Sequence, residues 1–469
     1  MNKVDNNVFI KIKPEFENLL TELGKNKFFT DISILAEKSE GKTYRHSKSG
    51  TSINDNMFAT TGAVIRLTTP AGLYEYSFNN FSKNFLNTIP EIISKETGFS
   101  DSSSNLVFSE TRIVFNKQTD YKTNPKDVND SIITTYLNDI YNTAKSYSEK
   151  ISDCVCVFQY LVIHKLFLSA SKDLEQHLMW SVGTTTPYVT VNGKSHYYYK
   201  PYSVLGGAEI LDIMGSHIDD ACKNVIDLID SEAATPGTYD VICMPDVTGL
   251  IAHEAFGHGV EEDMFVKDRA LAKNYMNKQI ASSLVTMHDN AFDISQAATY
   301  FFDDEGELSS DTVIIDKGIL VSGINDLLSA KFLNVTPTGN GRRESYERKV
   351  YTRMTNTYFE PGNSTLEEMI SSVKYGYLLD NGLSGMEDPK NWGIQCMVNI
   401  GREIKDGKLT GKVISPVCLS GYVPDLLNSI SMVSDTLTLS GSGYCGKGYK
   451  EWVKVSDGGP AIKARVTIS

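Results

Sequence analysis

Residues 238–258 read TYDVICMPDVTGLIAHEAFGH, and this stretch decides the architecture that we expect for the second half of the chain. Its beginning, Thr238–Pro245, is a short apolar run typical of a buried strand. A turn that contains glycine follows, and after it comes a helical segment that carries His253 and His258. The sequence therefore predicts a strand, a turn and a histidine-bearing helix in this order.

The residues that follow are rich in signals for hairpins. Ile315-Asp-Lys-Gly-Ile319 and Ile404-Lys-Asp-Gly-Lys408 each place a turn dipeptide between runs of strand-forming residues. Ser364-Thr-Leu-Glu367 has the pattern of a capping box and predicts that one helix begins there. The second half is therefore predicted to be mostly antiparallel β with helices added.

The first half of the chain is less regular. The run GAVIRLTT at Gly62–Thr69 predicts a strand, and the spacing of apolar residues over Asp127–Lys150 and Leu205–Ser231 predicts long helices. The second of these helices runs into Glu232-Ala-Ala-Thr-Pro-Gly237, which stops a helix and starts a turn. We therefore expect an α+β protein with an α/β-type domain at residues 1–232 and a β-rich domain, carrying the histidine-bearing helix, at residues 238–469.

Length and composition are those of a globular chain with two or three domains. Of the 469 residues, 41% are hydrophobic and 22% are charged, which excludes a disordered or coiled-coil chain. Lysine and arginine number 45 against 58 acidic residues, and the resulting net charge of −13 argues against nucleic-acid binding.

The same composition bears on the compartment. The longest apolar run, Cys154–Ile163, is too short to span a membrane, and the N-terminus lacks the apolar segment of a signal peptide. Seven cysteines without regular spacing are typical of a reducing environment. The sequence therefore predicts a cytoplasmic protein that does not enter the membrane.

His253-Glu254-Ala-Phe-Gly-His258 is an HExxxH motif. Neutral imidazoles bind zinc, and a carboxylate next to a ligand can act as a general base. On a regular α-helix, at ~100° per residue, this spacing turns the second histidine about 140° from the first, so that both could not reach one ion. A π-bulge would absorb the extra residue, and Gly257 would allow it. The alternative is a chance pairing of two of the eight histidines.

Two later stretches contain residue types suited to a site. Cys445 lies between glycines in Gly443-Tyr-Cys-Gly-Lys447, where it could be a zinc ligand or a free cysteine in a turn. Arg342 and Arg343 lie in Gly339-Asn-Gly-Arg-Arg-Glu-Ser-Tyr346, where they could bind a carboxylate or form a solvated surface run.

Three acidic residues follow the second histidine: Glu261, Glu262 and Asp263. We expect one of them to orient a ligand imidazole through its other nitrogen. If Cys445 is not the third ligand, Glu262 is the expected substitute.

Five motifs together resemble the TldD/PmbA family. In chain order they are HEAFGHGVEED, FDDEG at Phe302–Gly306, TPTGNGRRESY at Thr336–Tyr346, RMTNTY at Arg353–Tyr358 and the cysteine in YCGK. Their order and spacing are similar to the family's over most of Asp240–Ser469. The first half is similar only in outline, through GAVIRLTTPAGLYEYSFNN at Gly62–Asn80.

The resemblance implies a zinc metallopeptidase of the metal-bearing TldD branch, acting on small or unfolded peptides. It implies that His253, His258 and Cys445 bind zinc and that Glu254 is the general base. The residues predicted to bind substrate are Asn340, Arg342, Arg343 and Arg353. The resemblance also implies a dimer, either a homodimer or a heterodimer with a metal-free TldE/PmbA-like paralogue.

Two segments depart from the family pattern. Gly448-Tyr-Lys450 replaces the residues that usually follow CGK, and Gly385–Trp392 replaces a Gly-rich stretch. Two other functions remain open. One is a non-catalytic metal-binding regulatory subunit of a TldD/PmbA-type complex, and the other is an amidase that uses the same zinc site.

Overall fold

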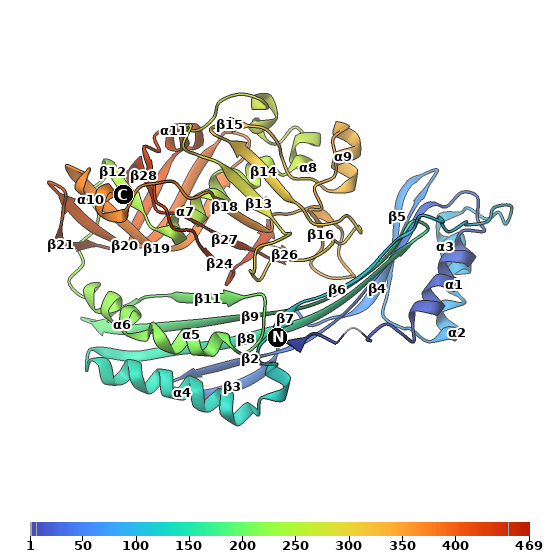
Figure 1. Ribbon diagram of the computed structural model, residues 1–469, viewed down its shortest axis with the longest axis horizontal. Helices are drawn as coiled ribbons and strands as arrows, with labels where there is room; N and C mark the ends of the chain where they lie inside the picture. Colours follow the sequence, from blue (N-terminus) through green and yellow to red (C-terminus); the bar gives the residue numbers. More distant parts are fainter. Residues whose placement is uncertain (1, 6, 449) are drawn as a thin grey trace.

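The computed structural model of the chain describes residues 2–5, 7–448 and 450–469. A long curved sheet of nine strands underlies a second, β-rich half (Figure 1). The sheet's central strands are 18, 19 and 20 residues long: β2 (Thr30–Ser47), β8 (Ile151–Ser169) and β9 (Lys172–Val191). Its other strands are β3 (Gly50–Asp55), β4 (Thr61–Thr69), β5 (Gly72–Phe78), β6 (Ile113–Gln118), β10 (Lys194–Tyr197) and β11 (Lys200–Val204), and a separate pair is formed by β1 (Asn2–Lys3) and β7 (Asp120–Tyr121).

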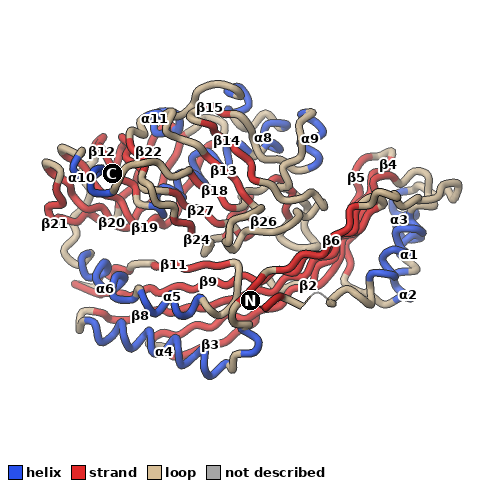
Figure 2. Tube along the Cα trace, viewed as in Figure 1, coloured by secondary structure: helices blue, strands red, loops and turns tan. Residues whose placement is uncertain are grey.

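Helices cover the two ends of this sheet (Figure 2). One end carries α1 (Lys13–Leu23), α2 (Lys83–Leu86) and α3 (Ile89–Thr97), and the other carries α4 (Asp130–Tyr147), α5 (Ile210–Ser216) and α6 (Ile218–Asp227), with the short 3-10 turn η1 at Pro125–Asp127. The predicted strand at residues 62–69 is confirmed as β4, and the helix predicted over residues 127–150 is confirmed as α4.

The single helix predicted over Leu205–Ser231 is wrong. The chain bends at His217, where φ of −118° and ψ of 15° are not helical, and forms α5 and α6 instead. The bend allows both helices to pack on the curved strand β9, with Met214 and Val225 buried against it. Hydrophobic periodicity continues across such a bend and therefore cannot reveal it.

The second half of the chain contains two larger sheets. The seven-stranded sheet consists of β12 (Gly237–Cys243), β19 (Tyr375–Asp388), β20 (Gly393–Lys405), β21 (Lys408–Ile414), β22 (Val417–Tyr422), β23 (Met432–Val433) and β28 (Ile462–Ile468). The six-stranded sheet consists of β13 (Met287–Asn290), β14 (Asp311–Asp316), β15 (Ile319–Leu320), β18 (Asn356–Phe359), β24 (Thr438–Ser440) and β27 (Ser456–Gly459). Most pairings are antiparallel, whereas β12–β19 and β18–β27 are parallel. The predicted α+β class is confirmed.

Two strand pairs and several short helices complete this half. The pairs are β16 (Gly341–Arg342) with β17 (Tyr351–Thr352), and β25 (Tyr444–Lys447) with β26 (Lys450–Lys454). The helices are α7 (Pro245–Ile251), η2 (Ala252–Gly257), η3 (His258–Val260), α8 (Glu262–Val266), η4 (Leu271–Tyr275), α9 (Leu327–Leu333), α10 (Leu366–Ser371) and α11 (Val423–Asn428).

Both predicted hairpins are confirmed. The turns Lys317-Gly318 and Asp406-Gly407 have positive φ at each residue, as two-residue hairpin loops require. The predicted capping box is one residue too early, because Thr365 caps α10 and exchanges hydrogen bonds with Glu368. Ser364 with Glu367 and Thr365 with Glu368 both fit the Ser/Thr-x-x-Glu pattern, so the pattern alone could not distinguish the two.

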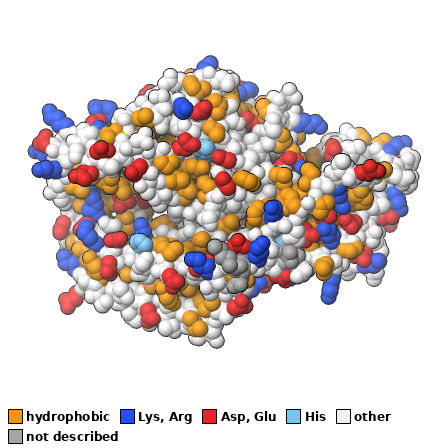
Figure 3. Space-filling view, viewed as in Figure 1, with side chains coloured by type: hydrophobic (Ala, Val, Ile, Leu, Met, Phe, Trp, Pro, Cys, Tyr) orange, Lys and Arg blue, Asp and Glu red, His pale blue; other side chains and the backbone are white. Residues whose placement is uncertain are grey.

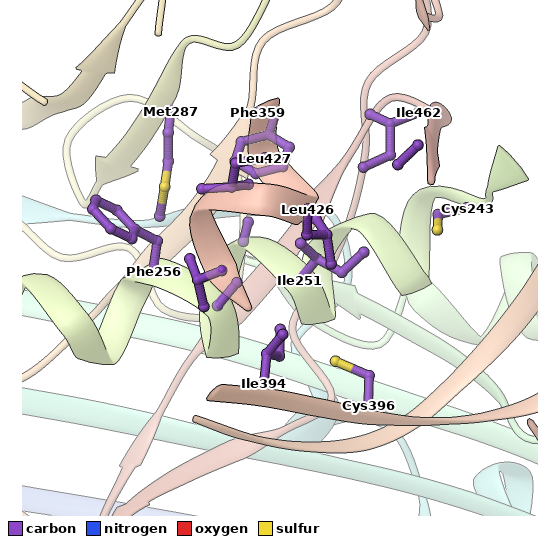
Figure 4. Packing of buried hydrophobic residues seen from close by; sticks show 14 of the residues in the cluster. Cys243, Ile251, Phe256, Met287, Phe359, Ile394, Cys396, Leu426, Leu427 and Ile462 are labelled. Atoms are coloured by element: carbon purple, nitrogen blue, oxygen red, sulfur yellow. The ribbon is translucent and has the colours of Figure 1, made fainter. Parts of the chain in front are cut away.

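The core of the second half surrounds the segment that carries the histidines. Ile251 lies between Ile394 and Cys396 of β20 on one side and Leu426 and Leu427 of α11 on the other, and Phe256 extends to the side of Met287 (Figure 4). This burial on two sides holds the segment in place.

Charged side chains of both signs are interspersed on the visible face of the molecule (Figure 3). Among the described residues, no helix is long and apolar enough to cross a membrane. The sheet of nine strands uses residues 30–204 and the two larger sheets of the second half use residues 237–468. The predicted division into domains at residues 1–232 and 238–469 remains a proposal.

Candidate metal centre

The histidine-bearing segment is a π-helix. After α7, the chain widens over Ala252–Gly257, and the amide of His258 donates to the carbonyl of His253, five residues earlier. The insertion predicted from the HExxxH spacing is therefore confirmed. It brings the two imidazole rings to a centroid distance of 5.3 Å with an angle of 86° between their planes.

Two glycines allow this segment to pack closely. A Cβ on Gly257 would lie 2.1 Å from Sδ of Met354, and a Cβ on Gly249, in α7, would lie 2.4 Å from the backbone nitrogen of Gly458. A side chain at Gly249 would push α7 away from the backbone of β27, whereas one at Gly257 would force the side chain of Met354 to move.

His253, His258 and Cys445 converge, although the cysteine comes from the distant strand β25. Their ligand atoms all lie within 4.8 Å of one another, and Sγ of Cys445 is 3.2 Å from Nε2 of His258. Within the described part of the chain, the buried Nδ1 of His253 has no hydrogen-bond partner. Two imidazoles and one thiolate are a donor set that fits zinc and leaves a coordination position open. Their role as zinc ligands remains a prediction.

The charges on the three side chains favour the thiolate form of Cys445. Burial alone would raise the pKa of Cys445, but the imidazoles of His253 and His258 lower it to about 4. Burial opposes the charge on His258, yet Cys445 and Glu261 raise its pKa well above the usual value. The thiolate is the metal-binding form of cysteine, whereas a protonated imidazole must give up its proton before it can bind a metal ion.

Of the three acids after the second histidine, Glu261 lies beside a ligand. Its Oε2 is 3.4 Å from Nδ1 of His258 and 3.1 Å from Nζ of Lys447. Glu262 instead accepts a hydrogen bond from Asn325, and Asp263 pairs with Lys447 at 2.8 Å. The expected orienting carboxylate is therefore best assigned to Glu261.

Glu254 follows the first histidine in the π-helix and is half-buried. A Cβ on Gly385 would lie 2.4 Å from its Cγ, so that β19 confines the side chain. The segment Gly385–Trp392, which departs from the family pattern, therefore forms one wall next to the predicted general base.

The four residues predicted to bind substrate have partners within the protein. Arg342 donates to the carbonyls of Met354 and Lys454 at 2.5 and 2.7 Å, and Asn340 donates to Asp289 at 2.8 Å. Arg343 donates to the carbonyl of Arg348 and to Glu75, and Arg353 donates to the carbonyls of Cys445 and Glu451. Contact with substrate remains a prediction for all four, and these bonds favour structural roles.

Two carboxylates that the sequence did not indicate lie close to the cluster. Both carboxylate oxygens of Glu387 are buried without a hydrogen-bond partner among the described residues, and burial raises the pKa of this group well above its usual value. Burial also raises the pKa of Asp457 to about 6, with opposing effects from His253 and Glu254. Neither residue has a spacing from the histidines that could have revealed it.

The motif FDDEG joins the second half to the long sheet. Asp303 accepts from the amide of Gly341, and Asp304 accepts from the amide of Arg343 and pairs with Lys165 of β8 at 2.5 Å. The motif is thus a buried turn that organises the arginine-bearing loop.

A cavity of about 100 Å³ lies between the long sheet and this loop. Tyr444 and Lys454 line it, and they form a cross-strand pair on the hairpin β25–β26. Cys445 is adjacent in the strand and therefore faces the opposite side, toward the histidines. The cavity and the cluster of His253, His258 and Cys445 therefore lie on opposite sides of the hairpin.

Comparison with known proteins identifies relatives of this chain. Residues 236–468 match the family model described as the PmbA/TldA metallopeptidase C-terminal domain. A metalloprotease TldD homolog from Buchnera aphidicola is 35% identical over 236 residues, which are 50% of this chain and 48% of that protein. A zinc metalloprotease TldD homolog from Saccharolobus solfataricus is 33% identical over 244 residues, 52% of this chain and 54% of that protein.

The match thus spans about half the length of these curated relatives. The crystal structure of TldE from Thermococcus kodakarensis has the same fold, with a TM-score of 0.75 and 18% identity, covering 97% of this chain and all of that chain.

Proposed function

Since the chain belongs to the TldD/PmbA family, we propose that it is a zinc-dependent metallopeptidase that hydrolyses small or unfolded peptides. One observation carries the proposal: the ligand atoms of His253, His258 and Cys445 converge, and Glu254 follows His253 in the π-helix that ends just before His258. When bound there, zinc supplies a Lewis acid that polarises a carbonyl group and lowers the pKa of a water molecule.

The chain's own residues perform the proton transfers. Glu254 accepts a proton from the attacking water and passes it to the leaving amine, as a general base and then a general acid. The neighbouring wall of β19 at Gly385 keeps the Glu254 side chain from turning away. Glu261 holds the imidazole of His258 through its Nδ1, which leaves Nε2 directed at the ligand cluster.

The proposal includes the protein's assembly and location. It acts in the cytoplasm as a homodimer or as a heterodimer with a metal-free TldE/PmbA-like paralogue. The likeness of its fold to TldE supports a partner of that kind, and its seven free cysteines, six of them buried, suit a reducing compartment. Enclosure of the site between subunits would restrict access to thin, extended chains.

Substitution of Glu254 by glutamine tests the chemistry. The variant Glu254→Gln keeps the size of the side chain and both histidines, so we expect it to bind zinc and to lose peptidase activity by about 100-fold or more. The measurement is cleavage of mixed short peptides, with and without a chelator, alongside zinc content. Glu367→Gln, an exposed carboxylate on α10, is the matched control and should retain full activity.

Two results would reject parts of this proposal. Normal turnover by Glu254→Gln would exclude Glu254 as the base. A wild-type protein that binds zinc but cleaves no peptide would favour the non-catalytic subunit, and cleavage of simple amides in place of peptides would favour the amidase.

A further inference from the structure

We propose that Arg353 is a positioning residue that couples the cysteine ligand to the carboxylate that orients His258. The inference rests on the zinc site of the proposed function. It assigns to Arg353 a role toward the metal ligands in place of the substrate contact that the sequence predicts.

Arg353 holds the strand that carries Cys445. Its side chain is only 1% exposed, and its Nη2 donates to the carbonyl of Cys445 at 2.8 Å. Its Nη1 donates to the carbonyl of Glu451 on the partner strand β26. One guanidinium therefore spans both strands of the hairpin at the level of the ligand.

The second of these contacts stabilises an unusual backbone. Glu451 has a φ of 61°, in the left-handed region that residues other than glycine rarely adopt. Such a conformation persists only where the surroundings impose it. The bond from Arg353 to the carbonyl of Glu451 is one such constraint, so the shape of the hairpin depends on this side chain.

The same guanidinium faces the carboxylate beside His258. Nε of Arg353 lies 3.4 Å from Oε1 of Glu261. Within the part of the chain that the structure describes, neither atom has a hydrogen-bond partner, so this is a charge contact between two buried groups and not a hydrogen bond. The other oxygen of Glu261 lies 3.4 Å from Nδ1 of His258. A continuous path thus runs from Cys445 through Arg353 and Glu261 to His258.

An arginine suits this position for a geometric reason. Its planar group presents donors in several fixed directions, which match two carbonyls and one carboxylate. Lysine could keep the charge but not all three contacts. Without any cation at this position, the carbonyls of Cys445 and Glu451 would lose this donor, and Oε1 of Glu261 would lose the guanidinium beside it, although Oε2 would keep its contacts with Lys447 and His258.

Cobalt and zinc titrations of the full-length protein test the role. We expect Arg353→Met to bind Co²⁺ and Zn²⁺ 10- to 100-fold more weakly than the wild type, the range typical for loss of a group that orients metal ligands. We also expect the thiolate-to-cobalt charge-transfer absorption to weaken or shift. Arg353→Lys should give an intermediate affinity.

Arg343→Met is the matched control for these titrations. It also removes a buried arginine, whose Nη groups contact Arg348 and Glu75 and not the hairpin. We expect its cobalt affinity and spectrum to equal those of the wild type. Circular dichroism establishes which variants are folded.

Three results would overturn the inference. The first is that Arg353→Met has the metal affinity and the cobalt spectrum of the wild type. The second is a raised KM in that variant, which would indicate that Arg353 binds substrate. If Arg353→Met does not fold, wild-type affinity and spectrum in Arg353→Lys would overturn it equally. A wild-type protein that binds neither metal would remove the proposed zinc site as well, which distinguishes failure of the function from failure of the coupling.

Discussion

At the level of single residues, the candidate site is a set of buried charges that compensate one another. Cys445 is stabilised as a thiolate by two imidazoles, and Glu261 lies between Lys447, Arg353 and His258. Burying any one of these groups alone would be costly, whereas together each has a counter-charge. The site therefore combines acidic, basic and thiol groups from separated parts of the chain.

A different histidine gives a test of residue electrostatics away from the metal ligands. Nδ1 of His288 lies 2.8 Å from Asp311, and its Nε2 lies 2.9 Å from Glu360. Burial lowers the pKa of His288, but these two carboxylates raise it above 6.5 overall. Because the folded pKa is the higher one, the stabilisation is fully present below the unfolded pKa of about 6.5 and is lost as pH rises through the folded value.

We therefore expect the wild type to lose stability relative to His288→Gln, which lacks the titrating group, as the pH rises from below about 6.5 through the raised folded pKa. Urea unfolding midpoints measured across this pH range check the difference. Parallel pH profiles for the two proteins would contradict the ion pairs described at His288.

At the level of elements, the π-helix and its supports determine where the histidines lie. The widened turn at Ala252–Gly257 brings His253 and His258 to the same side of the segment. The preceding helix α7 packs directly on β27. This contact is possible because Gly249 has no side chain where the backbone of Gly458 approaches.

Gly249→Ala tests this support. A Cβ there would lie 2.4 Å from a backbone atom that cannot rotate away, so we expect a loss of stability of about 1–3 kcal/mol. Gly393→Ala is the control, because nothing lies within 4 Å of a Cβ at that position. Urea unfolding of both variants checks the prediction. Equal midpoints would show that α7 can move away from β27 without cost.

Local patterns predicted the elements that local physics controls. The loops Lys317-Gly318 and Asp406-Gly407 form as predicted because glycine and its neighbour adopt positive φ there. The π-helix was predictable because two histidines five residues apart cannot face the same ion on a regular α-helix. The bend at His217 was not, because it depends on the curvature of β9, which arises from strands that lie far apart in the sequence.

At the level of the whole molecule, buried ion pairs join the long sheet to the second half. Lys165 of β8 lies 2.5 Å from Asp304 and 3.3 Å from Glu37, and Arg343 lies 2.9 Å from Glu75 of β5. The motifs FDDEG and GNGRRE therefore have partners in the first half of the chain. The sequence suggested a carboxylate-binding role for the arginines of the second motif, and only the fold reveals these partners.

Lys165→Met tests this junction. It would leave Glu37 and Asp304 buried without their shared cation, and we expect a loss of stability of about 3–5 kcal/mol. Lys412→Met removes an ion pair with Glu232 that is largely exposed and screened by solvent, so it should leave stability nearly unchanged. Thermal and urea unfolding compare the two variants. A similar small effect of both would mean that the junction is held by apolar contacts instead.

Sequence patterns say least about which distant residues come together at the site. His253 and His258 are five residues apart and could be paired by inspection, and the resemblance to a family brought in Cys445. Glu387 and Asp457 approach the same cluster from β19 and β27 without any motif. Residues that meet only through sheet packing have no spacing rule, so the structure was needed to find them.

The central claim is that His253, His258 and Cys445 hold one zinc ion. Zinc X-ray absorption on the purified protein tests it most directly, combined with elemental analysis. We predict about one zinc per chain, with one sulfur at about 2.3 Å and histidine nitrogen at about 2.0–2.1 Å, and loss of the sulfur contribution in Cys445→Ser. A protein that takes up no zinc, or a zinc shell without sulfur in the wild type, would contradict the account.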